Sequence, residues 1–230
     1  MPQFNNRDEW EASIKRELVN LTEPQVERLM KLLGDPPSGA NVPESFWNDL
    51  GADLTATLQP ALLSVYIEGA QQLLTTVPKV LRVDWHLVNE PAAAWAQQWS
   101  GFLVDGITAT SQDKLQNYVS SFFRNEGTTV DALRGQIGGL FGPVRAELIA
   151  TTEVTRAAAQ GDIGIVNEIE AANPRIMMVP FWDTSMDEWV CDICGPRHGN
   201  ARGKGWTEPP PAHVRCRCGL RWEPQPRGRR

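Results

Sequence analysis

Residues 182–218 organise the chain, and they read WDTSMDEWVCDICGPRHGNARGKGWTEPPPAHVRCRC. All four cysteines of the protein lie in this stretch: Cys191, Cys194, Cys216 and Cys218. Of the three histidines, His198 and His213 lie here as well. Because every thiol is confined to one short segment, we expect the thiols to act together at one site.

The spacing of these residues is typical of a zinc site. A C-x2-C pair is followed, after eighteen residues, by H-x2-C-x-C. A thiolate pair two residues apart can hold one Zn²⁺ from a tight turn, and a second pair then completes a tetrahedron. Five residues compete for four ligand positions: Cys191, Cys194, Cys216, Cys218 and His213. The surplus of protein ligands favours a structural zinc, since a catalytic zinc keeps an open position.

The sequence leaves the fourth ligand open between His213 and Cys218. If residues 213–218 form a turn, His213 pairs with Cys216 as a second knuckle. If they are extended, Cys216 and Cys218 share one face, because side chains alternate along a strand. Arg215 and Arg217 then share the opposite face.

Other uses of the thiols are less favoured. The N-terminal residues MPQFNNRDEW carry no secretory signal, so the thiols are expected to stay reduced in a cytoplasm rather than form disulfides. A cysteine hydrolase would pair Cys191 or Cys216 with His213 or His198. Four thiols at metal spacing argue against a single activated nucleophile. No apolar stretch reaches the roughly 18 residues of a membrane span, so no membrane partner is expected.

Charge is distributed unevenly along the chain. The net charge is −6, but residues 1–196 carry −13 and residues 197–230 carry +7. Such a basic segment can contact nucleic acid or an acidic protein surface. The candidate contacts are Arg215, Arg217 and Arg221. A solvated basic segment that balances the acidic body is an equally good interpretation.

The predicted fold is mainly α, with a small α+β module at the C-terminal end. Hydrophobic periodicity and turn residues divide the chain. The Cys/His module is expected to contain a short β hairpin or edge strands, from residues 175–182 and 219–222. The predicted parts are an N-terminal helical hairpin (1–34), a linker (35–43), a helical body (44–174), the zinc-binding module (175–223) and a disordered basic tail (224–230).

Two blocks of sequence together resemble a known family. One comprises DEWVCDIC at 187–194, the following Gly199 and PPAHVRCRC at 210–218; the other is ATTEVTRA at 150–157. They resemble the C-terminal signature and the preceding A-x-T-E-x-x-R-A helix of phage head morphogenesis proteins. These are minor capsid proteins similar to protein F of phage Mu. The resemblance covers roughly residues 80–223, and the first 80 residues carry no matching motif.

The resemblance implies a structural, non-enzymatic role in procapsid assembly near the portal, with a structural Zn²⁺. The expected partners are the portal, the major capsid or scaffolding protein and packaged DNA. The protein would assemble in the host cytoplasm and reside in the virion. Glu153 and Arg156, three residues apart on a helix, are expected to brace the metal module or to contact a partner. The alternatives are a zinc-dependent DNA-binding protein and a cysteine hydrolase acting in head maturation.

Overall fold

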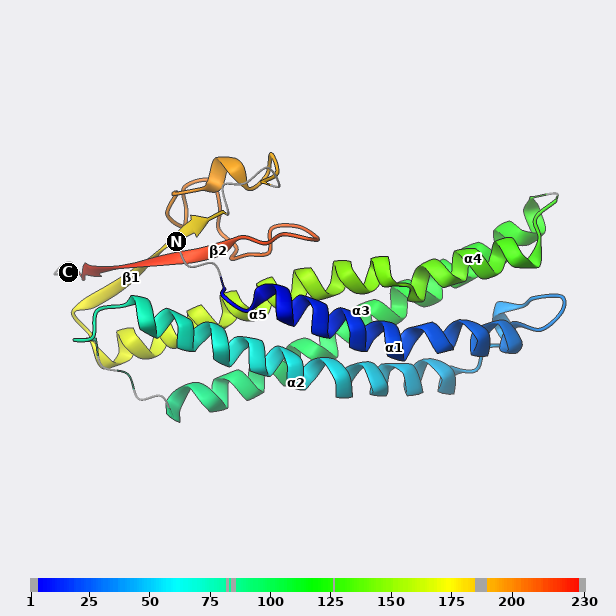
Figure 1. The fold of residues 1–230 in the computed structure, drawn as a ribbon, viewed down its shortest axis with the longest axis horizontal. Coiled ribbons are helices and arrows are strands. Elements are labelled where there is room, and N and C mark those ends of the chain that lie inside the picture. The colour runs from blue at the N-terminus through cyan, green and yellow to red at the C-terminus, as the bar shows by residue number, and fades with distance from the viewer. Residues whose placement is uncertain (1–3, 82, 84–85, 126, 185–189, 228–230) are drawn as a thin grey trace. The chain divides into compact units, whose positions relative to one another are not determined.

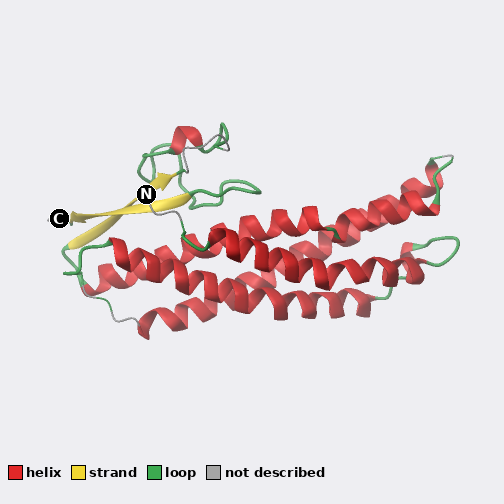
Figure 2. Ribbon diagram, in the orientation of Figure 1, coloured by secondary structure: helices red, strands yellow, loops and turns green. Residues whose placement is uncertain are grey.

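The structure is a computed structural model that describes residues 4–81, 83, 86–125, 127–184 and 190–227. It is mainly helical, with one small antiparallel sheet, as predicted (Figure 2). The elements are α1 (Arg7–Leu33), α2 (Glu44–Thr76), α3 (His86–Arg124), α4 (Val130–Phe141), α5 (Pro143–Ala172), β1 (Ile176–Asp183) and β2 (Gly219–Pro226), with 3-10 turns at Gly39–Asn41 and Gly195–Arg197. Within the described ranges, no helix combines the length and apolar character needed to cross a membrane.

The predicted helical hairpin at residues 1–34 is wrong, because α1 is one continuous helix. Pro24 lies inside it and removes a backbone N–H from the helix ladder. Leu18 before the proline and Leu29 after it are both buried. Burial of one apolar face on both sides of Pro24 outweighs the missing hydrogen bond, since packing supplies most helix stability in proteins. The helix ends where Gly34 adopts a φ of 77°.

Contacts within the chain group it into two compact units. Unit 1 comprises Met1–Glu11, Ala61–Ala96 and Leu148–Arg230, and unit 2 comprises Ala12–Pro60 and Gln97–Glu147. This grouping differs from the predicted boundaries at 35–43 and at 174. The reason is that the four long helices each contribute residues to both units.

Unit 2 is an all-helical unit built on leucine-rich faces. Its most deeply buried side chains include Leu18, Leu29, Leu50, Leu54, Leu58, Leu133 and Ile137. Ion pairs at its surface join Lys15 to Glu147 (2.8 Å) and Arg134 to Glu27 (3.0 Å). Exposed pairs of this kind add little stability, so the apolar core holds this unit together.

Within unit 1, α2 and α5 approach each other closely through glycines. A Cβ atom on Gly161 would lie 2.1 Å from the carbonyl oxygen of Tyr66, and one on Gly69 would lie 2.9 Å from that of Ala158. Beside this contact lies an apolar cluster that includes Tyr66, Leu73, Ile165, Ile169 and Met178. Because glycine has no side chain, the backbones of α2 and α5 can come into contact at these positions. The apolar cluster packs beside this contact and stabilises it.

The sheet of unit 1 pairs β1 with β2 in antiparallel register, from Ile176 opposite Pro226 to Asp183 opposite Gly219 (Figure 1). The two predicted strands are thus confirmed. The predicted disordered tail is wrong for residues 224–226, which belong to β2; residues 228–230 lie outside the described residues. Arg227 extends the pairing, since its backbone N–H donates to the carbonyl of Arg175 (2.8 Å). Its guanidinium also pairs with Glu170 (2.7 Å).

Candidate metal centre

The first pair of cysteines lies on a tight turn. The backbone N–H groups of Cys194 and Gly195 both donate to the carbonyl of Cys191, at 3.1 and 2.9 Å. A 3-10 turn, Gly195–Arg197, follows directly, with Pro196 in its first positions. This geometry directs both sulfurs to one side, with Cys194 buried and Cys191 partly exposed.

The second pair of candidate ligands also lies on a turn. The N–H of Cys216 donates to the carbonyl of His213 at 3.1 Å. Arg215 adopts a φ of 64°, in the left-handed region that favours glycine, and thereby closes the turn. Of the two geometries considered from sequence, the turn is the one observed between His213 and Cys216.

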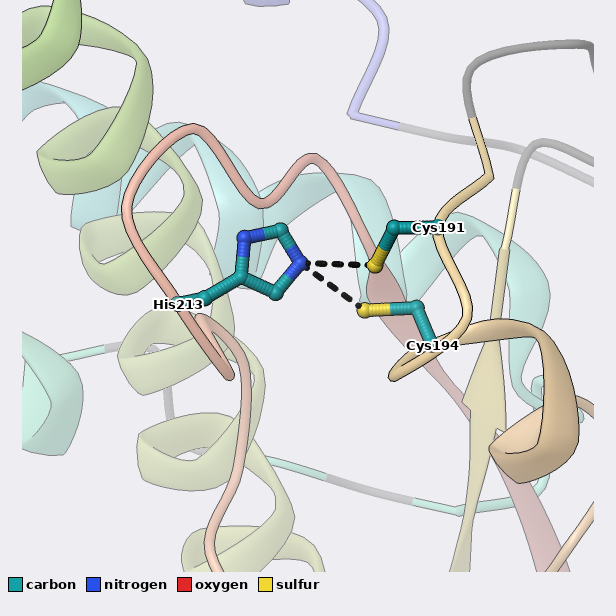
Figure 3. A group of neighbouring side chains, drawn as sticks. All are labelled: Cys191, Cys194 and His213. Atoms are coloured by element: carbon teal, nitrogen blue, oxygen red, sulfur yellow. Dashed lines mark hydrogen bonds between the residues drawn. The ribbon is translucent and has the colours of Figure 1, made fainter.

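The two turns face each other and bring the side chains together. Figure 3 shows the His213 ring directed at both sulfurs of the first turn, with Nε2 3.1 Å from Cys191 Sγ and 3.3 Å from Cys194 Sγ. The sulfurs of Cys194 and Cys216 are 3.8 Å apart. Zn–S bonds of about 2.3 Å and Zn–N bonds of about 2.0 Å give tetrahedral edges of about 3.8 Å (S–S) and about 3.5 Å (S–N). These three separations are close to tetrahedral edges, with the nitrogen slightly closer to the sulfurs than such an ion requires.

All five predicted candidates meet in this place. The ligand atoms of Cys191, Cys194 and His213 lie within 4.8 Å of one another, as do those of Cys194, Cys216 and Cys218. All four cysteines are free thiols, so the disulfide alternative is not observed. The expected convergence is confirmed, and the cluster could hold a metal ion.

Electrostatics in the cluster favour charge on the Cys216 sulfur. The hydrogen bond from the Cys218 thiol lowers the pKa of Cys216 to about 5, against the effect of burial. The same hydrogen bond, together with burial, raises the pKa of Cys218. Burial and the neighbouring Cys216 charge raise the pKa of Cys194 to about 12. Burial also opposes ionisation of Cys191, but the backbone N–H groups of Cys194 and Ile193 outweigh it and lower the Cys191 pKa.

The His213 ring is oriented by its own loop. Its Nδ1 atom lies 2.8 Å from the carbonyl oxygen of Val214, so Nδ1–H donates there and leaves Nε2 directed at the sulfurs. Metal-binding histidines are commonly oriented by such a bond. His198 lies elsewhere: its Nδ1 accepts from the backbone N–H of Thr184 (3.1 Å) and is 3.7 Å from Asp183. It belongs to neither ligand group.

Helix α5 holds the second ligand turn through two threonines. The N–H of Arg215 donates to Thr152 Oγ1 (3.0 Å), and Thr155 Oγ1 donates to the carbonyl of Cys216 (2.7 Å). Arg7 in turn donates to Thr155 Oγ1. Sequence reasoning missed Thr152 and Thr155, although their spacing of three residues on a predicted helix, inside the ATTEVTRA block, was the available signal.

The predicted brace, Glu153 and Arg156, forms an ion pair of 3.2 Å on α5, with the Glu153 side chain nearly fully buried. Hydrogen bonds of the neighbouring Thr152 and Thr155 tie α5 to the ligand turn. The bracing role of Glu153 and Arg156 stays a prediction.

Two of the three predicted contact arginines pair with acidic residues of unit 1. Arg217 donates to Glu11 (3.1 Å) and also pairs with Asp8. Arg221 pairs with Glu223, and its guanidinium lies 4.7 Å from the centre of the Phe181 ring. Arg215 is exposed on the second ligand turn. The positive charges of Arg217 and Arg221 are thus largely compensated within the chain.

The Cys/His cluster has a small apolar interior and an exposed apolar surface. Trp182 and Trp206 pack edge to face beneath the cysteines, with ring centres 5.4 Å apart. The Trp206 indole N–H donates to the carbonyl of Asn200 (2.7 Å). Between the ligands, Ile193 is 51 % exposed and Val214 is 61 % exposed. Each turn therefore points its ligands inward and one apolar side chain outward.

Comparisons of the chain with protein-family models, with curated proteins and with solved structures gave no match. The function is therefore inferred from the geometry of this cluster and from the sequence itself.

Proposed function

We propose that the cluster is a structural zinc site whose ligands are Cys191, Cys194, His213 and Cys216. Three cysteines and one histidine from two facing turns are a common zinc ligand set. The Cys218 thiol donates a hydrogen bond to the Cys216 sulfur. On this view Cys218 stabilises a ligand thiolate, as the groups around a metal site often do.

The module around the cluster is small, which gives the metal a role in folding. Its regular structure is one two-stranded sheet, and a hairpin alone is marginally stable in water. The apolar interior beneath the cysteines rests mainly on Trp182 and Trp206. A bound ion adds its binding free energy to folding and so compensates for the limited apolar burial.

We propose that the protein is a phage head morphogenesis protein, a minor capsid component acting in procapsid assembly near the portal. The observation that carries this proposal is the hydrogen bonding of Thr152 and Thr155 to the second ligand turn. These threonines lie in one of the two blocks that resemble the family, and the ligand turn lies in the other. The two blocks are distant in the sequence but contact each other in the fold. This contact supports the family resemblance that both blocks carry.

The alternatives have weaker support. A cysteine hydrolase needs one nucleophile paired with one base, whereas His213 Nε2 faces Cys191 and Cys194 at nearly equal distances.

A DNA-binding role needs available cations, and Arg217 and Arg221 are paired with acidic residues. Binding to DNA would weaken steeply with salt, whereas docking on an apolar protein surface would not.

The test is quantitative mass spectrometry of procapsids and mature virions purified from the source phage or an induced lysogen. We expect the protein in a few copies per portal. Absence from both particles would contradict the head-protein proposal. It would not bear on the zinc site, which measurement of the zinc content tests separately.

A further inference from the structure

Unit 1 contains a partly open cavity of about 310 Å³ next to the Cys/His cluster, with Cys218 in its wall. One face of α2 and one face of α5 form its sides, while the start of β2 and the segment around Phe4 and Arg7 complete the lining. On α5, the lining residues follow helical spacing: Thr155, Ala158, Ala159 and Asp162. The cavity therefore lies on ordered helix faces.

The volume arises from small side chains at the α2–α5 contact. Gly69 and Ala158 bring the two backbones together, since a Cβ atom on Gly69 would lie 2.9 Å from the Ala158 carbonyl oxygen. Ala159 lines the same space without filling it. Bulkier residues at these positions would close the cavity, so its presence follows from the residue sizes.

Two buried donors in the cavity wall lack an acceptor. Arg7 Nε and Trp222 Nε1 are both enclosed, and neither makes a hydrogen bond of normal geometry among the described residues, although the Trp222 indole lies beside the Asp162 carboxyl. Arg7 is only 5 % exposed, and its Nη1 atom is already used on Thr155. Buried polar groups in folded proteins are nearly always paired, so these two donors indicate a missing acceptor.

Asp162 is a further polar group of the cavity, whose lining also includes Asp183 and the paired Arg221 and Glu223. Burial raises the pKa of this carboxyl well above its usual value, although the nearby Trp222 indole N–H opposes the shift. A neutral carboxyl does not repel an anion and can itself donate a hydrogen bond. Asp162 is thus compatible with an anionic acceptor beside Arg7 and Trp222.

We propose that this cavity binds a carboxylate carried on a short apolar chain. Arg7 Nε–H and the Trp222 indole N–H donate to the carboxylate, while Leu73 and Ala159 contact the apolar chain. The carboxylate can belong to a free short-chain acid or to the C-terminal residue of a partner polypeptide. The proposal is independent of the head-protein function and of metal identity.

The first test uses the full-length wild-type protein, ¹⁵N-labelled, titrated with hexanoate and in parallel with hexanol. We expect the Trp222 indole N–H resonance to shift in a saturable manner with hexanoate and not with hexanol. An equal shift with both compounds, or no shift with either, would overturn the proposal. This titration needs no variant that could misfold.

Variants then locate the interaction. Trp222→Phe assigns the resonance and should weaken hexanoate binding about tenfold, as expected for loss of a hydrogen bond to a charged group. Trp99→Phe on α3, outside the cavity, is the matched control and should bind as the wild type does. Unchanged affinity in the Trp222→Phe variant would contradict the proposal.

A short peptide ending in leucine distinguishes the two sources of carboxylate. If the free-acid peptide binds more tightly than hexanoate, and the amidated peptide does not bind, the cavity accepts a partner's C-terminus. If hexanoate binds more tightly, the cavity accepts a free acid. Binding of the amidated peptide as tightly as the free acid would exclude recognition of the carboxylate.

Discussion

Cys194 belongs to both groups of candidate ligands, whereas Cys191 belongs to the group with His213. Cys218 differs from them, since it donates a hydrogen bond to Cys216. His213 alone supplies a nitrogen. Cys218 should therefore respond to substitution differently from the other three residues, which makes the assignment of the ligands testable residue by residue.

Substitution of the first-turn cysteines should remove the metal. We expect the wild type to contain one zinc per chain, and Cys191→Ser or Cys194→Ser to contain almost none, as measured by inductively coupled plasma mass spectrometry. His213→Ala should also lose zinc, whereas Cys218→Ser should retain most of it. Loss in Cys218→Ser with retention in His213→Ala would reverse the assignment of the fourth ligand.

Asp162 should make stability depend on pH. Because its folded-state pKa is raised, the folded protein holds the proton more strongly than the unfolded chain does. The stabilising contribution is complete below the ordinary Asp value of about 4 and is lost as pH rises through the folded pKa. Asp162→Asn should therefore raise the melting temperature at pH 7 by about 2–4 °C, for a gain on the order of 1 kcal/mol. The advantage should vanish near pH 3; an advantage that persists there would contradict this account.

At the scale of elements, the α2–α5 contact should not tolerate a side chain at position 161. A Cβ atom there would lie 2.1 Å from backbone, so Gly161→Ala must separate the helices and should cost more than about 3 kcal/mol. Gly135→Ala on α4 is the matched control. Its Cβ meets nothing within 4 Å, and it should stabilise the helix by about 0.5–1 kcal/mol. Urea denaturation measures both changes, and equal effects would contradict the close packing.

The threonine contacts should stabilise the second ligand turn. Thr155→Val keeps the shape of the side chain but leaves the Cys216 carbonyl and an Arg7 donor without a partner. The expected cost is about 1–3 kcal/mol, seen as faster zinc transfer to a chromogenic chelator. Thr57→Val on α2, whose hydroxyl donates to the Asp53 carbonyl of its own helix, should leave the transfer rate unchanged.

The elements differ in how far the sequence predicts them. The two strands and the first ligand turn follow from local signals, namely β-prone runs and the C-x2-C spacing, whereas the second turn is one of two geometries that the sequence leaves open. The continuity of α1 through Pro24 does not, since it depends on packing against distant residues. The threonine contacts join residues more than sixty positions apart, and a single sequence does not show such a pairing. The fourth ligand stayed open for the same reason, because it depends on Arg215 adopting a left-handed φ.

For the whole molecule, removal of the metal should affect one part of the structure much more than the rest. Trp182 and Trp206 lie beneath the cysteines, whereas the helices have their own apolar cores. Incubation with EDTA should shift tryptophan fluorescence to longer wavelength and weaken the near-ultraviolet circular dichroism. The far-ultraviolet helical signal should change little. Loss of the helical signal together with the fluorescence change would show that the helices depend on the metal.

Ile193 and Val214 occupy the positions between ligands on the two turns, and both side chains point outward. Evolution can therefore exchange these two residues without changing the metal, the turns or the buried tryptophans. A lineage that acquires a new binding partner could adapt this surface by point substitution while the framework beneath it stays constant. Randomisation of positions 193 and 214 would also give a library of altered surfaces on one stable framework.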